Sequence, residues 1–303
     1  MRNKIFTLSC LLVFAFGSVL AQETETEKAI DKPVRSPFES GYLIDNQTTV
    51  IQPVNTLEFA IQHKFGSFEN GSSDLFGLYA AGANIRLGLN YVVANNVQVG
   101  IGVTKERMTT DFNAKWTILE QTRNNTVPLA LALYGNIAID GRDKDQLNPF
   151  DESQTEYEFS NRLSSFAQVI VGRKISDVVS LQAGVSFSHY NLIDYGNYHD
   201  KVGVHLNGRF KVTPQGSIIF NFDAPLDLDY LDSAKNYNNP EPNFSLGYEI
   251  STSTHAFQIY AGNSNGLIQQ DIMVNNTTNV LNDGFINIKK YMIGFTITRL
   301  WNF

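Results

Sequence analysis

The chain has 303 residues, of which 43% are hydrophobic, and its formal net charge is −7 at pH 7. This acidic balance, without any domain-sized basic block, argues against a nucleic-acid partner, because binding to phosphates requires basic patches. The single cysteine, Cys10, lies within the first 21 residues, so the remaining chain can form neither disulfides nor thiolate metal sites.

The first 21 residues have the pattern of a cleaved secretory signal peptide. Arg2 and Lys4 precede an apolar stretch over 8–20, and a small-residue cleavage site ends at Ala21. This apolar stretch is shorter than the roughly 20 residues that a helix needs to cross a bilayer. Cleavage after Ala21 lowers the net charge from −7 to −9 and leaves no apolar run that is long enough for a membrane helix.

Residues 22–55 differ in character from everything that follows. The segment 23–27 is acidic and polar, Pro33 and Pro37 come next, and only short stretches near 42–44 and 50–51 are apolar. This composition predicts a leader without fixed structure, followed by a short ordered N-terminal extension on the periplasmic side. A position that plugs a barrel mouth and one along its rim both fit the composition.

From residue 56 onward, apolar residues alternate with polar or small residues, with a break after about ten positions. A period of two is that of β-strands. In 84–91, for example, Ile85 and Leu87 share one face, and Arg86 and Gly88 share the other. The pattern predicts twelve strands, near 57–64, 84–91, 97–104, 111–119, 127–138, 161–172, 178–190, 201–212, 217–223, 243–250, 255–262 and 286–303.

Two of these strands depart from clean alternation. In 161–172, Phe166 and Ile170 fall on the face opposite to the other apolar residues. In the last strand, Arg299 interrupts an otherwise aromatic and apolar face made of Phe295, Ile297, Trp301 and Phe303. Either Arg299 extends toward lipid head groups, or a β-bulge at this point turns Leu300 outward.

The connections between the predicted strands alternate between short and long. The short ones are 92–96, 120–126, 173–177, 213–216 and 251–254, and the long ones are 66–82, 140–158, 191–200, 224–242 and 263–284, with 105–110 as one short exception. Short periplasmic turns and long external loops are typical of outer-membrane barrels, whereas a soluble β-sandwich has no reason to sort its loops. We therefore predict an all-β, antiparallel up-and-down transmembrane β-barrel of about 12 strands over 56–303.

Several segments resemble an outer-membrane β-barrel family of unknown function that is found in Bacteroidota. They are 38–40, 43–47, 57–66, 74–78, 84–89, 97–102, 257–259, 263–264 and 294–299. The resemblance covers most of the chain after the signal peptide. It implies location in the cell outer membrane, and it supplies no activity or catalytic residues.

The sequence contains no convincing catalytic or metal-binding pattern. In enzymatic barrels that resemble the twelve-stranded outer-membrane phospholipases, a histidine and a serine two positions apart lie on the same face of one strand and form a nucleophile pair. Here Ser188 and His189 are adjacent, so on a strand they point to opposite faces and cannot share a proton. The acidic loops near 140–152 and 227–232 do not fit the twelve-residue calcium loop. We predict no enzymatic activity, no metal site and no cofactor.

If the apolar strand faces contact lipid, the polar faces line the lumen. The ionisable lumen candidates are Glu58, Lys64, Arg86, Lys115, His205, Arg209, Asp223 and Glu249. Together with Lys211 they give five basic and three acidic groups, which would make a conducting lumen weakly selective for anions.

Twelve strands lie between the small barrels that side chains fill and the large barrels that hold water, so a narrow pore and a lumen closed by salt bridges both fit. Our leading hypothesis is a narrow passive channel for small polar solutes. The alternative is a non-transporting barrel that acts as a scaffold or accessory subunit of an envelope complex. The predicted partners are outer-membrane lipid and possible envelope proteins, with no nucleic acid.

Overall fold

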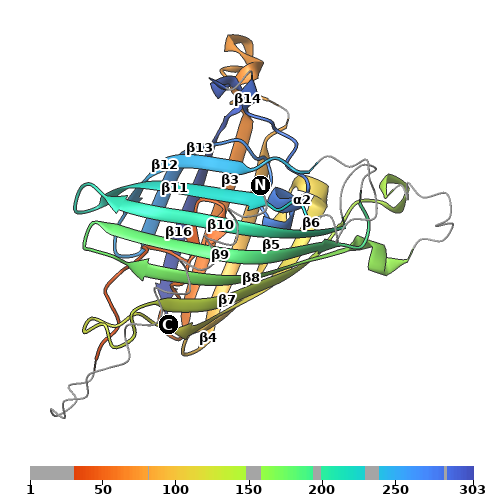
Figure 1. Ribbon diagram of the computed structural model, residues 1–303. Helices are drawn as coiled ribbons and strands as arrows, with labels where there is room; N and C mark the ends of the chain where they lie inside the picture. The colour runs from red at the N-terminus through yellow and green to blue at the C-terminus, as the bar shows by residue number, and fades with distance from the viewer. Residues whose placement is uncertain (1–30, 81, 148–157, 194–198, 229–238, 283–284) are drawn as a thin grey trace, which may run out of the picture. The chain divides into compact units, whose positions relative to one another are not determined.

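The computed structural model describes residues 31–80, 82–147, 158–193, 199–228, 239–282 and 285–303 (Figure 1). Within these ranges, twelve strands form a closed barrel in which β16 (Met292–Asn302) pairs antiparallel with β3 (Thr56–Ser67). The predicted up-and-down transmembrane-type barrel is confirmed. The predicted signal peptide at 1–21 lies outside the described residues.

Between β3 and β16, each wall strand pairs antiparallel with its neighbours along the chain. These strands are β4 (Asn84–Ala94), β5 (Val97–Thr104), β6 (Thr109–Leu119), β7 (Ala130–Ile139), β8 (Leu163–Lys174), β9 (Val179–Tyr190), β10 (Asp200–Lys211), β11 (Gly216–Pro225), β12 (Asn243–Ser251) and β13 (His255–Gly262). The largest error in the predicted bounds is at the last strand, which begins at Met292 rather than near 286, because Ile288–Lys290 forms a 3-10 turn.

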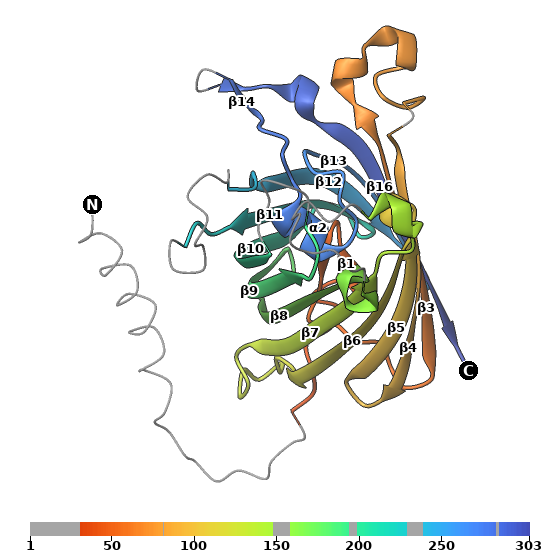
Figure 2. The same ribbon diagram turned by 90° about the vertical axis from the view of Figure 1, so that its right-hand side faces the viewer.

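Smaller elements lie outside the wall. A two-stranded hairpin is formed by β1 (Tyr42–Leu43) and β2 (Asn46–Gln47), and another by β14 (Leu281–Asn282) and β15 (Phe285–Ile286). One short helix, α2 (Gln269–Val274), is described. Seen along the barrel, β1 and α2 lie within the ring of wall strands (Figure 2). No helix among the described residues is long and apolar enough to cross a membrane.

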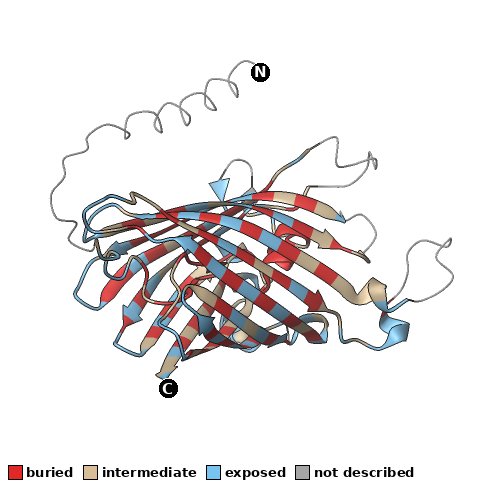
Figure 3. Cartoon of the chain, turned by 90° about the horizontal axis from the view of Figure 1, so that it is seen from below, coloured by how far each residue is buried: buried red, intermediate tan, exposed pale blue. Residues whose placement is uncertain are grey.

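Burial alternates along every wall strand, as Figure 3 shows. In β4, Leu87 is 40% exposed and points outward, whereas its neighbour Arg86 is 3% exposed and points inward. The outward residues of the barrel are therefore apolar and the inward ones mostly polar. This is the inverse of a soluble protein and the arrangement that a lipid environment requires.

The connections are sorted between the two ends of the barrel. One end, here called the turn end, has 95–96, 120–129, 175–178, 212–215 and 252–254, and the opposite long-loop end has 68–83, 105–108, 140–162, 191–199, 226–242 and 263–291. Both the segment that precedes β3 and the end of β16 belong to the turn end. The predicted sorting holds for most connections, with the short exception after β5 now at 105–108, but 120–129 at the turn end is slightly longer than 191–199 at the opposite end.

The two irregular strands have different explanations. In β8, Phe166 and Ile170 point inward and are almost completely buried, at 2% and 1% exposure. In β16, the pairing with β3 is continuous from Gly294 to Asn302, and the only shift lies between Met292 and Gly294. Of the two alternatives that the sequence left open for Arg299, the β-bulge is therefore excluded. The guanidinium of Arg299 instead lies over the ring of Trp301, 4.7 Å from its centroid.

Candidate functional site: the filled lumen

The segment 33–53 runs through the inside of the barrel. Pro33 bridges to Thr122 at the turn end, and the chain then enters the lumen and reverses at Ile44 and Asp45, the turn between β1 and β2. Residues 38–50, which we call the lumen hairpin, are almost all buried. The sequence left open a position that plugs the barrel mouth and one along its rim, and the described part of the extension lies deeper than either, within the lumen.

Wall side chains hold the backbone of the lumen hairpin by hydrogen bonds. On one side of the lumen, Gln258 accepts from the Ile44 amide at 2.8 Å and donates to the Tyr42 carbonyl at 3.0 Å. Further contacts of this kind are Gly41 N to Glu58 Oε1 at 3.0 Å, Thr117 Oγ1 to the Thr49 carbonyl at 2.8 Å, and Gln182 Nε2 to the Gln47 carbonyl at 2.7 Å. The wall side chains therefore supply hydrogen-bond partners to backbone groups of the hairpin that would otherwise be buried in the lumen without one.

Ion pairs fix the tip and the base of the lumen hairpin. At the tip, Asp45 lies 2.7 Å from Lys64 of β3, and neither side chain has any exposed surface. At the base, Arg209 of β10 contacts Glu39 at 2.5 Å and Glu249 of β12 at 3.2 Å. Because the tip and base pairs join the hairpin to opposite ends of the wall, they define how deeply it sits.

A second ion pair lies within the wall itself. Arg86 makes a bidentate contact with Asp111 of β6, at 2.8 and 2.6 Å, and donates to Gln62 at 3.0 Å. The hydroxyl of Tyr42, on the lumen hairpin, accepts from Arg86 at 3.5 Å and from Asn90 at 2.9 Å. This bidentate arrangement is among the strongest that a guanidinium forms with a carboxylate.

A chain of three side chains on β9, β10 and β11 has the order of a catalytic triad. Ser186 Oγ lies 2.7 Å from His205 Nε2, and His205 Nδ1 lies 2.6 Å from Asp223 Oδ1. The same carboxylate also accepts from Asn46 of the hairpin and from Asn243 of β12, at 2.5 and 2.9 Å. Ser186 is only 4% exposed, and α2 packs over this part of the wall.

Helix α2 fills the lumen from the long-loop end. Its residues Ile272, Met273 and Val274 are at most 2% exposed. They belong to one apolar cluster with wall residues of β7, β8 and β9, namely Ala132, Tyr134, Phe166, Ile170 and Tyr190. Gln269 of α2 donates to the Asp45 carbonyl at 3.1 Å, so the helix and the lumen hairpin meet inside the barrel.

The buried positive and negative charges inside the barrel are nearly equal in number. Among the described residues, five buried basic side chains face six buried acidic ones: Lys64, Arg86, Lys115, Lys201 and Arg209 against Asp45, Glu58, Asp111, Asp223, Glu249 and Asp271. The predicted basic excess of five to three is therefore wrong for the filled lumen. It omitted Asp111 and Lys201, counted the half-buried Lys211, and could not include the acids of the lumen hairpin and α2.

All eight lumen candidates from the sequence lie inside the barrel, at 4% exposure or less. The structure brings Arg209 to Glu249, and His205 to Asp223, but pairs Lys64 and Arg86 with acids that were not candidates. Asp111 could have been found, because it lies on the same strand face as Asn113 and Lys115, which follow it at every second position. The partner Asp45 could not, because nothing local in the sequence places the extension inside the barrel.

The chain is similar to one protein family and to several solved structures. The model of a family described as a membrane bound beta barrel domain, DUF5777, matches residues 38–301. Similar solved structures include an outer membrane channel from Pseudomonas putida F1, at 12% identity and a TM-score of 0.49, covering 83% of this chain and 97% of that one. The KdgM porin, at 7% identity, and the NanC porin, at 6%, each have a TM-score of 0.44 and cover 82% of this chain and 99% of theirs.

No curated protein sequence matches the chain significantly. Within the part of the chain that the structure describes, no group of three or more histidine, cysteine, aspartate or glutamate side chains is arranged to hold a metal ion.

Proposed function

We propose that this chain, which belongs to the DUF5777 family of membrane bound β-barrel domains, is an outer-membrane channel for small polar solutes that the lumen hairpin closes. The observation that carries this proposal is the chemistry of the hairpin's contacts. Hydrogen bonds and ion pairs to polar wall groups anchor it along its length, and water can replace contacts of this kind. The long-loop end would face the exterior, as in other outer-membrane barrels.

Many of the contacts that hold the lumen hairpin are hydrogen bonds, which water can replace. Exchanging a typical hydrogen bond for bonds to water changes stability by only about 0.5–1.5 kcal/mol, because the wall and the hairpin groups are both resolvated. The apolar contacts of the hairpin lie in one cluster, in which its residues Phe38, Leu43 and Ile44 are buried with the wall residues Ile219 and Tyr260.

The turn of the lumen hairpin carries backbone strain that withdrawal would relieve. Ile44 has a φ of +56°, a left-handed conformation that is unfavourable for a β-branched residue. Such conformations persist only where surrounding contacts enforce them, and each costs about 1–3 kcal/mol. Here the enforcing contacts are the pairing of β1 with β2 and the bond from the Ile44 amide to Gln258. The docked hairpin therefore stores energy that favours release.

Withdrawal of the lumen hairpin alone would leave five basic and five acidic buried side chains around the lumen, since only Asp45 leaves with it. An open channel should then conduct small ions of both signs, without a strong preference for either. The proposal assigns no catalytic role to Ser186 and His205. Instead, they orient the Asp223 carboxylate that receives Asn46 of the hairpin.

The test is conductance in planar lipid bilayers of the full-length protein and of a variant that lacks residues 33–52. Wild type should be closed for most of the time, whereas the deletion should produce frequent or sustained openings. Heat-modifiable migration on gels verifies that the variant is still a folded barrel. If the folded deletion variant shows no conductance, the channel proposal is rejected.

A second candidate function is favoured by exposed apolar side chains at the long-loop end. Two neighbouring loops, joined by a hydrogen bond from Phe68 N to the Tyr291 carbonyl, carry Leu75, Phe76, Tyr79, Leu281, Phe285, Ile286 and Ile288, each at least 45% exposed. Contiguous exposed apolar groups are typical of protein interfaces. If the barrel recruits an envelope protein through these loops, Phe285→Ser should abolish co-purification of that protein. The control Phe112→Ser alters the lipid-facing side of the wall and should leave the partner bound.

A further inference from the structure

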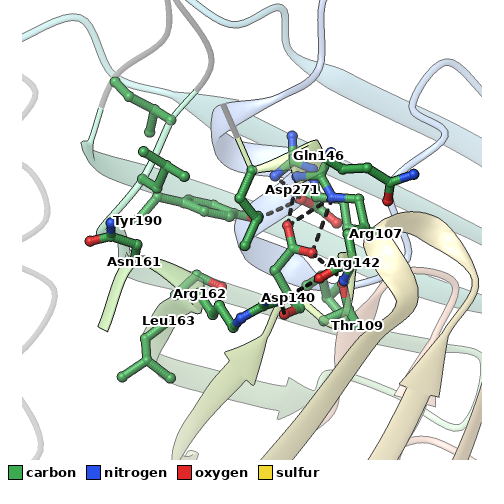
Figure 4. A pocket seen from close by; sticks show the side chains of 15 residues that line it. Arg107, Thr109, Asp140, Arg142, Gln146, Asn161, Arg162, Leu163, Tyr190 and Asp271 are labelled. Carbon is green, nitrogen blue, oxygen red and sulfur yellow. Dashed lines mark hydrogen bonds and ion pairs between the residues drawn. The ribbon is translucent and has the colours of Figure 1, made fainter. Parts of the chain in front are cut away.

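Arginines line a cavity at one end of the barrel and a groove at the other. The cavity lies beside α2 at the long-loop end, and its charged lining residues are Arg107, Asp140, Arg142, Arg162 and Asp271 (Figure 4). Arg142 makes a bidentate contact with Asp140, at 3.1 and 2.6 Å. Arg107 and Arg162 also have partners within the chain. The arginines of this cavity therefore hold its own connections together.

The groove at the turn end, which we call the basic groove, has a different balance of charge. Its volume is about 480 Å³, and its basic lining residues are Arg35 of the extension, Arg123 of the connection after β6, and Arg173 and Lys174 of β8. Among the described residues that line it, only Asp177 is acidic, and this carboxylate pairs with Lys174 at 3.2 Å. Three guanidinium groups therefore lie in one groove without a partner carboxylate, in a chain whose formal net charge is −7.

These three guanidinium groups keep most of their donors available. Among the described residues, the Arg35 side chain has no hydrogen-bond or ion-pair partner. Arg123 donates only through Nε, to the Pro33 carbonyl at 3.1 Å, and Arg173 donates only through Nη2, to Asn125 at 3.4 Å. Like charges in one groove repel one another unless an anion offsets them. The planar fork of donors on each arginine matches the oxygens of a phosphate group.

The position of Arg173 indicates the source of this phosphate. Arg173 follows Val169 and Val171 at every second position of β8, on the outward face, where these two side chains are 44% and 37% exposed. It therefore lies where the apolar outer face of the barrel ends, and a long arginine side chain at such a place reaches the lipid head groups. Ile175, which also lines the basic groove, is 56% exposed. Basic and apolar groups side by side fit the boundary between head groups and acyl chains.

From these observations we propose that the basic groove binds the head group of an anionic phospholipid, such as phosphatidylglycerol, in the leaflet at the turn end. The phosphate oxygens accept from the guanidinium groups of Arg35, Arg123 and Arg173, and Ile175 contacts the acyl chains. Because Arg35 belongs to the extension and the other two arginines do not, the bound phosphate joins the stem of the lumen hairpin to the wall. The inference goes beyond the proposed function, since the groove can hold a lipid whether or not the barrel conducts.

The test is native mass spectrometry of the full-length protein in detergent, titrated with phosphatidylglycerol or with phosphatidylcholine of the same acyl chains. Phosphatidylcholine has the phosphate without a net negative charge, so its Kd should be about tenfold higher. Arg123→Gln combined with Arg173→Gln should raise the Kd for phosphatidylglycerol about tenfold, and Arg35→Gln alone about threefold. The matched control, Lys211→Gln with Arg299→Gln, removes two basic groups at the turn end outside the groove and should leave the Kd unchanged. Heat-modifiable migration verifies that each variant is a folded barrel.

Other results would overturn the site or its ligand. Equal binding of the two lipids, or an equal effect of the two double variants, would mean that only the general charge of the turn end attracts lipid, and would overturn the site. Glycerol 3-phosphate has the phosphate without acyl chains, so if it bound as tightly as phosphatidylglycerol, free phosphate would be the ligand and the lipid would be rejected. Tighter binding of a glutamate-rich peptide, lost in Arg123→Gln with Arg173→Gln, would reject the lipid in favour of an acidic protein partner.

Discussion

The lumen hairpin and α2 fill the same barrel with opposite chemistry. Polar wall groups bond the hairpin through its backbone, and its ion pairs reach Lys64 and Arg209. Helix α2 instead presents three apolar side chains to an apolar patch on β7, β8 and β9. The hairpin also buries Phe38, Leu43 and Ile44 in an apolar cluster, but its ion pairs and hydrogen bonds are contacts that water can replace. Helix α2 has mainly apolar contacts with the wall, so we infer that the hairpin is the element suited to move and α2 the element suited to stay.

The apolar wall patch that contacts α2 also explains why this helix should remain in the lumen. Fully burying a large apolar side chain contributes about 1.5–3 kcal/mol, and α2 buries Ile272, Met273 and Val274 together. If α2 withdrew, these residues and the wall patch would all face water. A barrel with a fixed helix at the long-loop end and a removable hairpin below it would therefore open from the turn end upward.

The largest loss of stability is expected from removing a side chain of the apolar wall patch that contacts α2. Phe166→Ala removes a side chain that is 2% exposed and should lower the free energy of unfolding by about 3–5 kcal/mol, because it leaves a cavity between β8 and α2. Urea unfolding in detergent or lipid measures the change. The control Val169→Ala alters the outward face of the same strand, where the side chain is 44% exposed, and should cost much less. Equal costs would show that α2 is not held by apolar packing.

The base of the lumen hairpin should give the next largest effect. Arg209→Ala removes the partner of both Glu39 and the buried Glu249, which should cost about 3 kcal/mol, because Glu249 is left without its cation. Unfolding measurements and bilayer recordings together should show lower stability and more frequent openings. The control Arg299→Ala removes a guanidinium from the outer face and should change neither. A less stable Arg209→Ala barrel that stays silent would mean that the hairpin base does not control opening.

Removing a contact at the tip of the lumen hairpin should lower stability less, but it should clearly increase the frequency of channel openings. Asn46→Ala removes bonds to Asn221 and Asp223 and should weaken docking by about 1–3 kcal/mol, since the wall keeps its other bonds to the carboxylate. Openings should become about tenfold more frequent for each 1.4 kcal/mol. Asn70→Ala, in a long loop, is the matched control. Unchanged gating in Asn46→Ala would indicate that the hairpin does not leave as a unit.

The smallest effect is expected at the triad-like chain. Ser186→Ala removes one hydrogen bond to His205 and should change stability by no more than about 1.5 kcal/mol. A fluorophosphonate reagent, which labels activated serines, should label neither wild type nor this variant. Labelling of wild type that disappears in Ser186→Ala would identify a hydrolase site and would remove the positioning role proposed for His205.

The sequence alone was enough to establish the barrel, because its signals are local. A period of two decides the face on which each residue lies, and loop lengths separate the two ends. One feature of the sequence also reflects the filled lumen. Phe166 and Ile170 interrupt the alternation of β8, because this strand has an apolar outer face and packs against α2 on its inner face. Only the positions of those two residues could be read from the sequence, not the element that covers them.

Tertiary structure decided what occupies the lumen and which charges pair. Lys64 meets Asp45 and Arg209 meets Glu39 because the extension folds back into a closed ring, a contact between segments that no local pattern relates. The cavity beside α2 likewise joins residues from connections that are far apart along the chain. The physical reason is that the alternation along a strand depends only on neighbouring residues. What fills the lumen depends instead on contacts between segments that are far apart in the sequence and come together only in the closed barrel.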